Sequence, residues 1–216
     1  MHHGRVAAAA ARPASSYWTH GASIYTNAWV SGGAVPGPDE GELAAEAVEL
    51  QINGVSWSGF ESKPCVLGGL EKHDARDFLK QLSETMGFNA LRIPFSANAL
   101  VSALQPPICS EDRMLAGHNP RYRKLSYIEQ LALLIRDAGD VGMLVMLDLH
   151  RLHEGRKGKP SGSLDELELM ERAWEMVGRE LCDADKYWNF FAADLRNEPY
   201  AAHWGEPNDW ERGRCA

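Results

Sequence analysis

Apolar and polar residues alternate in blocks along most of the chain, and these blocks predict a series of strands. Residues 48–57 (VELQINGVSW) alternate and are rich in branched side chains, which indicates a strand. Residues 90–95 (ALRIPF) and 190–195 (FFAADL) predict two further strands. Residues 143–149 (MLVMLDL) form a short continuous apolar run, which is typical of a strand buried on both faces.

Three segments between these strands have the periodicity of helices. Residues 74–86 place apolar side chains on one helical face and are followed by Gly87, a residue type that commonly ends a helix. Residues 126–129 (SYIE) and 163–166 (SLDE) are capping-box patterns, and an apolar stripe follows each of them. The expected inner faces are Phe78, Leu79, Leu82 and Met86, then Ile128, Leu131, Leu134, Ile135 and Ala138, then Leu167, Met170, Trp174, Val177 and Leu181.

The alternation of strands and helices defines the fold class. The order β-α-β-α-β-α-β predicts an α/β fold with a parallel sheet and crossover helices. An open doubly wound sheet and a (β/α)8 barrel both fit, but no glycine-rich phosphate loop follows the first strand. Polar residues follow two of the apolar runs, where the active face of a barrel would lie: Asp148, His150, Asn197 and Glu198. A complete barrel needs eight units and about 250 residues, so we predict a (β/α)8 TIM-barrel type truncated after about the fourth βα unit.

The N-terminal part of the chain has a different composition. Up to about residue 42 it is rich in Gly, Ala, Pro and Ser, and residues 31–42 (SGGAVPGPDEGE) have the composition of a linker. Residues 17–30 suit a short hairpin ahead of this linker. We therefore expect a flexible N-terminal segment with a short hairpin over residues 1–44, and the α/β domain over residues 45–216.

Charge and hydropathy argue against two classes of partner. The 216 residues are 44% hydrophobic and 24% charged, as in ordinary globular proteins. The net charge of −8 and the pI of about 5.5 argue against nucleic acid as the main partner. No apolar run approaches the roughly 20 residues that span a bilayer, so no membrane span is expected. The N-terminal MHHGRVAAAAARP lacks the leucine-rich core of a secretion signal and resembles a tail or a misplaced start.

The cysteines are widely spaced and form no CxxC pair, which argues against a zinc site or a redox motif. Disulfides, in an exported protein, and buried free thiols both fit this pattern. The four cysteines are Cys65, Cys109, Cys182 and Cys215.

The sequence Asn197-Glu198-Pro199 follows the last predicted strand and offers an acid for catalysis. Hydrolysis of a glycosidic bond needs a carboxylic acid that protonates the leaving oxygen, and a retaining enzyme also needs a nucleophilic carboxylate about 5–5.5 Å away. Asn197 is suited to hydrogen-bond a substrate hydroxyl. The alternative is a polar turn in which the proline ends the strand.

Two other polar residues are candidates for the same site. Arg92 lies inside a predicted buried strand, so it needs a partner or solvent. It would either orient a nucleophilic carboxylate or form a plain salt bridge between strands. His150 would donate to a sugar hydroxyl or position a catalytic group. The rival is a metal cluster of His150, His153 and Glu154, although this spacing matches no common helical zinc motif.

Aromatic residues near the ends of predicted strands are candidates for binding sugars. Trp57, Phe60, Trp204 and Trp210 lie on or near such loops, and a flat indole is a suitable platform for the apolar face of a sugar ring. The alternative for Trp204 is an anchor that holds its loop in place.

Four segments together resemble the family 5 glycoside hydrolases in their order and rough spacing. They are INGVSWSGFE (residues 52–61), GFNALRIPFS (87–96), GMLVMLDLHR (142–151) and DLRNEPYAAHWGEPNDW (194–210). The likeness extends over most of the chain and is closest to the secreted, cellulase-type endo-β-1,4-glucanases. It implies a (β/α)8 barrel that hydrolyses a β-linked polysaccharide, with cellulose or β-glucan expected first, by a retaining two-carboxylate mechanism.

The resemblance also implies roles for individual residues. Glu198 matches the acid/base of the family and Asn197 matches its sugar-binding neighbour. Arg92 matches the arginine that supports the nucleophile, and His150 matches a histidine that lines the site at the end of the third strand. No metal and no organic cofactor is expected for this chemistry.

Departures from the family pattern limit what this chain is expected to do. The nucleophilic glutamate of the family follows the seventh strand, and the chain has no seventh strand. The histidine and tyrosine that follow the sixth strand in the family are also missing. The resemblance therefore implies the N-terminal half of a secreted retaining β-glycanase that is inactive alone. A non-catalytic carbohydrate-binding half-barrel and a metal-dependent barrel hydrolase are the alternatives.

Overall fold

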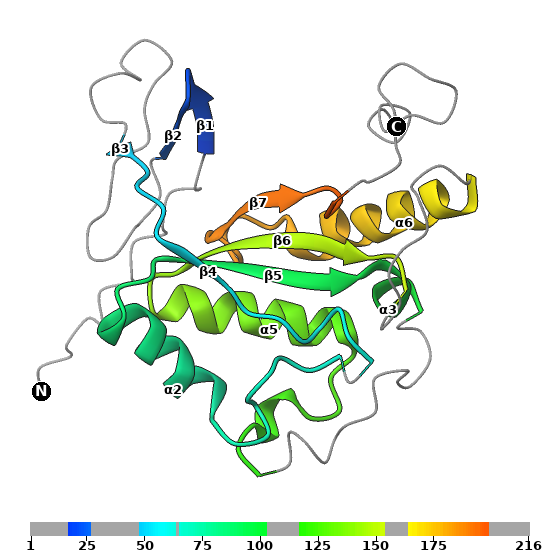
Figure 1. Cartoon of the computed structure of the whole chain (residues 1–216), viewed down its shortest axis with the longest axis horizontal. Helices are drawn as coiled ribbons and strands as arrows, with labels where there is room; N and C mark the ends of the chain where they lie inside the picture. Colours follow the sequence, from blue (N-terminus) through cyan, green and yellow to red (C-terminus); the bar gives the residue numbers. More distant parts are fainter. Residues whose placement is uncertain (1–16, 27–47, 64, 103–116, 154–163, 199–216) are drawn as a thin grey trace, which may run out of the picture.

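The computed structural model describes residues 17–26, 48–63, 65–102, 117–153 and 164–198 (Figure 1). These residues form two sheets, a three-stranded antiparallel sheet and a four-stranded parallel sheet. The strands of the parallel sheet are β4 (Gly54–Ser56), β5 (Ala90–Ser96), β6 (Leu144–Arg151) and β7 (Phe190–Asp194).

The strand order of the parallel sheet distinguishes the two predicted architectures. Each strand pairs with the next one in sequence, giving the order β4-β5-β6-β7. A doubly wound sheet reverses its order at a switch point, whereas a barrel keeps the order of the sequence. The predicted alternation of strands and helices is confirmed, and the order is that of a barrel.

The first predicted strand is divided, because side-chain amides replace strand partners in its middle. It consists of β3 (Val48–Glu49) and β4, with an irregular stretch between them. The backbone N–H of Asn53 donates to Asn89 Oδ1 (2.8 Å), and Asn89 Nδ2 donates to Gln51 O (2.7 Å). Asn53 Nδ2 also donates to Gly87 O (3.0 Å). These bonds take up backbone groups that a continuous strand would pair with a neighbour.

Helices cover one face of the parallel sheet, with α5 lying along it (Figure 1). Among the described residues, no helix is both long and apolar enough to cross a membrane. The short helix α3 had no counterpart in the predicted pattern and begins at Ser96, whose Oγ accepts from Ala99 N (3.3 Å). The helical elements are α2 (Ala75–Lys80), the π-helix η1 (Gln81–Thr85), α3 (Ala97–Val101), the 3-10 helix η2 (Pro120–Tyr122), α5 (Tyr127–Asp140) and α6 (Leu164–Leu181).

The predicted helix over residues 74–86 changes from α to π geometry halfway, which corrects part of its expected inner face. Leu79 and Leu82 are buried as expected, but Met86 is 53% exposed. A π-turn holds more residues than an α-turn, so side chains after it rotate away from the original stripe. The chain then leaves the helix at Gly87, whose φ of +75° suits a glycine.

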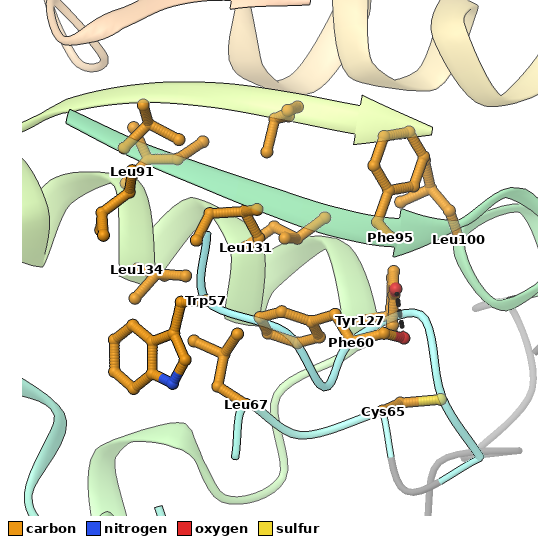
Figure 2. Close-up of a cluster of buried hydrophobic side chains, with 14 of the residues drawn as sticks. Trp57, Phe60, Cys65, Leu67, Leu91, Phe95, Leu100, Tyr127, Leu131 and Leu134 are labelled. Atoms are coloured by element: carbon orange, nitrogen blue, oxygen red, sulfur yellow. Dashed lines mark hydrogen bonds between the residues drawn. The ribbon is translucent and has the colours of Figure 1, made fainter. Parts of the chain in front are cut away.

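The main core lies between the sheet and the helices (Figure 2). Leu91 and Phe95 of β5 point toward Leu131 and Leu134 of α5, and all four side chains are buried. Alternate residues of a strand face opposite sides of the sheet. Arg92 therefore projects from the face that the helices leave open.

A second apolar cluster holds the N-terminal hairpin against the beginning of the sheet. The predicted hairpin is present as β1 (Tyr17–His20) and β2 (Ser23–Thr26), and β2 pairs with β3. The hydroxyl of Tyr17 donates to Trp188 O (2.8 Å), and its ring lies 5.9 Å from the ring of Phe191. The hairpin thus packs beside the N-terminal end of β7. The predicted boundary between residues 44 and 45 lies outside the described residues.

The structure decides between a disulfide and a free thiol for two of the four cysteines. Cys65 is fully buried and disulfide-bonded, so it is not a free thiol. Cys182 is exposed and free. The partner of Cys65 lies outside the described residues.

A complete capping box starts α5, as predicted. Ser126 Oγ accepts from Glu129 N (3.4 Å), and the Glu129 carboxylate accepts from Ser126 N (2.7 Å). The Ser126 hydroxyl also donates to the Glu129 carboxylate (2.7 Å). The hydrogen bonds that this carboxylate accepts from the Ser126 side chain and backbone hold the pKa of Glu129 below its usual range. The predicted capping residue Ser163, at the start of α6, lies outside the described residues.

Replacing Ser126 with alanine is expected to lower the free energy of unfolding by about 1 kcal/mol, because the helix loses its N-cap. Urea denaturation at neutral pH measures this difference. A group with a lowered pKa stabilises the fold above its unfolded pKa, so the difference should narrow as the pH falls through the lowered pKa of Glu129. Ser58→Ala, at an exposed side chain, is the matched control and should change nothing. Equal stabilities for the two variants would contradict the proposed contribution of the cap.

Candidate active site

One nitrogen of Arg92 joins three neighbouring strands on the open face of the parallel sheet. Arg92 Nη2 lies 3.0 Å from Asp148 Oδ2 of β6 and 3.1 Å from Asp194 Oδ2 of β7. The same nitrogen donates to Asn197 Oδ1 (2.9 Å), just beyond β7. The two carboxylates lie side by side because the register of the sheet pairs Asp148 of β6 with Asp194 of β7. The guanidinium is therefore held by two carboxylates and one amide.

His150 joins this cluster through Asp148. The two residues are separated by one position on β6, so their side chains leave the same face of the sheet. His150 Nδ1 lies 2.7 Å from Asp148 Oδ2. The predicted strand ended at Leu149, so only His150 lay beyond it, but β6 extends to Arg151 and includes both residues. The strand is longer than the apolar run because β6 continues to pair with β5 as far as Arg151.

Asp148 is the buried centre of the cluster. Its side chain is fully buried, and its Oδ1 has no hydrogen-bond partner among the described residues. Burial raises the pKa of Asp148, while the hydrogen bond with His150 and the positive charge of Arg92 oppose that rise. The neighbouring charge of Asp194 adds to the rise.

The residues after β7 are fixed by hydrogen bonds to α6 and β6. The bonds are Trp174 Nε1 to Leu195 O (3.2 Å), Arg196 Nη1 to His150 O (2.9 Å) and Asn197 N to Leu149 O (3.1 Å). Each bond involves one of the three consecutive residues before Glu198. These bonds fix the backbone that leads to Glu198, and Asn197 contacts Arg92 on the open face.

Asn197 and Glu198 have different surroundings. A guanidinium only donates hydrogen bonds, so the Asn197 atom that faces it is the amide oxygen. The Asn197 amide nitrogen is then directed to other acceptors. Glu198 is exposed and has a φ of +43°, in the left-handed region that residues with side chains rarely adopt. A strained backbone at a polar residue is typical of functional sites.

The structure brings together most of the residues expected at the site. Arg92, His150 and Asn197 belong to one cluster of hydrogen bonds and ion pairs, and Glu198 follows Asn197 in sequence. Trp204 lies outside the described residues, as does Glu154 of the alternative metal cluster. Within the described part of the chain, no three His, Cys, Asp or Glu side chains are grouped as ligands for a metal ion.

Trp57 is placed elsewhere, which corrects its expected role as a sugar platform. Its side chain is only 6% exposed and packs in the main core (Figure 2). The indole N–H donates to Gly68 O (2.9 Å), and the ring lies 4.6 Å from the ring of Phe78 in α2. Trp57 follows β4 but turns toward the helices, so it offers no face to a ligand. Phe60, the neighbouring candidate, is also buried.

The carboxylates that hold Arg92 were not assigned this role from the sequence. Asp148 was noted only for its position near the end of an apolar run, and Asp194 was treated as part of a strand. The available signal was Arg92 itself, because a charge in a buried strand requires partners of opposite charge. Which carboxylates supply them depends on the register between strands.

Comparisons with known proteins find that this chain is similar to cellulases. The profile of the cellulase family, glycosyl hydrolase family 5, matches residues 48–214. An endoglucanase of Paenibacillus polymyxa is 32% identical over 173 residues, which are 75% of this chain and 40% of that protein. The major extracellular endoglucanase of Xanthomonas campestris pv. campestris is 31% identical over 182 residues, which are 77% of this chain and 34% of that protein.

A solved structure shows the same fold. The endocellulase from Pyrococcus horikoshii, in a complex with cellotetraose, superposes with a TM-score of 0.67 and is 29% identical. The match covers 91% of this chain and 51% of that chain. The present chain thus spans about half the length of the solved relative, and less of the two endoglucanases. The predicted fold class is confirmed, since the described parallel sheet corresponds to about half of a (β/α)8 barrel.

Proposed function

This chain belongs to the cellulase family, glycosyl hydrolase family 5, and on that premise we propose that it carries the acid/base half of the active site of a retaining β-glycanase. One observation supports this most directly. Arg92 holds the Asn197 amide (2.9 Å) on the open face of the sheet, immediately before Glu198. The carboxyl ends of parallel barrel strands are where active sites of this fold lie.

Glu198 is the proton donor in the proposed reaction. Its carboxyl group gives a proton to the glycosidic oxygen as the bond from that oxygen to the sugar carbon breaks, and a nucleophilic carboxylate forms a bond to the same carbon. Glu198, now ionised, removes a proton from water as the water displaces that carboxylate. The nucleophile is expected from the strands that complete the barrel, outside the four described here.

Asn197, Arg92 and His150 prepare the site for a sugar. The Asn197 amide nitrogen is directed away from Arg92 and is proposed to donate to a hydroxyl beside the reacting carbon. Arg92 supplies positive charge that is proposed to support the nucleophilic carboxylate. His150, held by Asp148 at 2.7 Å, is proposed to hydrogen-bond a second hydroxyl.

The proposed substrate is a β-linked glucan, with cellulose first, and the proposed location is outside the cell. The cellotetraose complex of the Pyrococcus horikoshii endocellulase supports the substrate. The Xanthomonas campestris relative is named an extracellular endoglucanase, which supports the location. The disulfide at Cys65 supports it independently, because disulfides persist in oxidising compartments.

Replacing Glu198 with glutamine tests the acid/base role in a complete barrel. Residues 48–198 of this chain would replace the segment that they match in the Paenibacillus polymyxa endoglucanase. On carboxymethylcellulose, Glu198→Gln is expected to lower kcat by about 10²–10⁴-fold, the usual contribution of general acid–base catalysis. Glu175→Gln, at an exposed position of α6, is the matched control and should leave kcat unchanged. An undiminished kcat in Glu198→Gln would refute the assignment.

A second substrate separates proton transfer from a structural role of Glu198. Dinitrophenyl cellobioside has a leaving group that departs without a proton, so its first step does not need the acid. Glu198→Gln should keep a rapid burst of dinitrophenolate and then turn over slowly. If both the burst and the turnover were lost, the substitution would have caused a structural defect. The 216-residue chain alone is expected to hydrolyse neither substrate, and turnover that Glu198→Gln abolishes would show that no second half is required.

A further inference from the structure

A single oxygen of Asp148 contacts both His150 and Arg92, and this limits which ring nitrogen of His150 carries the proton. Asp148 Oδ2 lies 2.7 Å from His150 Nδ1 and 3.0 Å from Arg92 Nη2. An ionised carboxylate oxygen only accepts hydrogen bonds. A protonated Asp148 would carry its proton on Oδ1, because Oδ2 already faces a guanidinium that can only donate. In both states His150 Nδ1 must supply the hydrogen of the 2.7 Å contact.

We infer that Asp148 is a positioning residue that holds neutral His150 in the Nδ1–H tautomer, so that Nε2 faces the ligand as a hydrogen-bond acceptor. The second ring nitrogen has no hydrogen-bond partner among the described residues, and 26% of the side chain is exposed. A neutral imidazole has one donor and one acceptor nitrogen. His150 then receives a hydrogen from a hydroxyl of the ligand, whereas the sequence had suggested that it donates one.

Hydrogen bonds also fix the backbone at His150, which keeps the base of its side chain in place beside Asp148. Arg196 Nη1 donates to the carbonyl oxygen of His150 itself (2.9 Å). The preceding carbonyl, of Leu149, accepts from Asn197 N (3.1 Å). A ring flip would replace the donor that faces Asp148 by a C–H group, and the fully buried carboxylate would lose its hydrogen bond to the ring.

Asp194 offers a contrast within the same cluster. Its Oδ2 lies 3.1 Å from the same Arg92 nitrogen, and no contact joins Asp194 to His150. Loss of the Asp148 carboxylate therefore leaves Arg92 with the oxygens of Asp194 and Asn197, but leaves His150 without its partner. Replacing Asp148 is thus expected to change the tautomer of His150, whereas replacing Asp194 is not, although both carboxylates contact Arg92.

Long-range ¹H–¹⁵N NMR of the histidine-labelled 216-residue chain tests this inference, at a pH where imidazole is neutral. The His150 signals are identified by their loss in His150→Gln. We expect the Nδ1–H tautomer in the unaltered chain and in Asp194→Asn, and a mixture of both tautomers in Asp148→Ala. Asp148→Asn, whose amide oxygen still accepts, should restore the Nδ1–H form and guards against a folding defect in Asp148→Ala. An Nε2–H tautomer in the unaltered chain, or no change in Asp148→Ala, would overturn the inference.

The identity of the ligand hydroxyl rests on the proposed function, whereas the tautomer does not. In the chimeric enzyme described above, Asp148→Ala and His150→Ala should each lower kcat/KM by about 10-fold, the effect of one lost hydrogen bond. The double variant should lose no more than either single variant, because both remove the same interaction. If the losses of kcat/KM in the two single variants added up in the double variant, Asp148 would not act through His150. A confirmed tautomer in a chimera without activity would reject only the proposed function.

Discussion

Alanine at position 59 is expected to lower the free energy of unfolding by about 3 kcal/mol or more, through overpacking added to backbone strain. A Cβ at Gly59 would lie 2.2 Å from Val66 O, 2.7 Å from Leu67 Cα and 2.8 Å from Gly68 N. All three atoms belong to the backbone, so no side-chain rotation relieves the clash. The φ of +139° adds strain for any residue with a Cβ.

The effect should extend beyond the loop itself. Gly68 N donates to Ser58 O (2.9 Å), and Gly68 O accepts the indole N–H of Trp57 (2.9 Å). A displaced backbone at Val66–Gly68 would break these bonds and open the core beside Trp57. Urea denaturation followed by tryptophan fluorescence measures the loss.

Gly69 provides the matched control in the same loop. Its φ of +91° is also unfavourable for other residues, but a Cβ there would meet no atom within 4 Å. Gly69→Ala should therefore cost only the strain, about 1–2 kcal/mol. If the two alanine variants were equally destabilised, the close approach of the backbone at Gly59 would not be the cause.

Removal of the Asp137 carboxylate is the second large effect expected, with a loss of about 2–3 kcal/mol in Asp137→Ala. Asp137 is 1% exposed and accepts from Arg76 Nε (3.1 Å), Arg121 Nη1 (3.0 Å) and the hydroxyl of Tyr122 (2.9 Å). These donors come from α2 and η2, so one carboxylate of α5 joins three elements. Burial and the charge of Asp137 raise the pKa of Tyr122, whose hydroxyl would stay buried without its acceptor.

The expected loss is smaller than for a fully buried ion pair. The side chains of Arg76 and Arg121 are 48% and 44% exposed, so water solvates both guanidinium groups after the carboxylate is removed. Most of the loss should therefore come from the hydroxyl of Tyr122. In a Tyr122→Phe background, Asp137→Ala should cost clearly less than it does alone.

Asp140 is the matched control for Asp137. It lies in the same helix and contacts the same Arg76 at 3.7 Å, but its side chain is 70% exposed. Asp140→Ala should change the free energy of unfolding by less than about 1 kcal/mol. Thermal and urea unfolding measure the stability of Asp137→Ala, alone and with Tyr122→Phe, and of Asp140→Ala. Comparable losses of stability in Asp137→Ala and Asp140→Ala would contradict a role for burial.

Local patterns predicted the elements of this fold well, and tertiary contacts account for the errors. Periodicity located β5, β6, β7 and α5 because their buried faces repeat along the chain itself. The break between β3 and β4 depends on Asn89, which is distant in sequence from Asn53. The exposure of Met86 depends on a π-turn, and the direction of Trp57 depends on its contact with Phe78.

The candidate site was predictable only in part for the same reason. Arg92, His150 and Asn197 were proposed from their positions in or after predicted strands and then from family motifs, and the structure places them in one cluster. The pairing of Arg92 with Asp148 and Asp194 requires the register of three strands, which no single motif contains. The catalytic role of Glu198 remains a prediction until the chimeric enzyme is assayed.

The strand order of the parallel sheet bears on aggregation. Among the described residues, β7 pairs only with β6, so its other edge has no strand beside it. No residue of β7 is fully buried, although four of its five residues are apolar. An unpaired, apolar edge of this kind readily accepts another strand from a neighbouring molecule. A further strand of the barrel that pairs with this edge would therefore also guard the protein against aggregation.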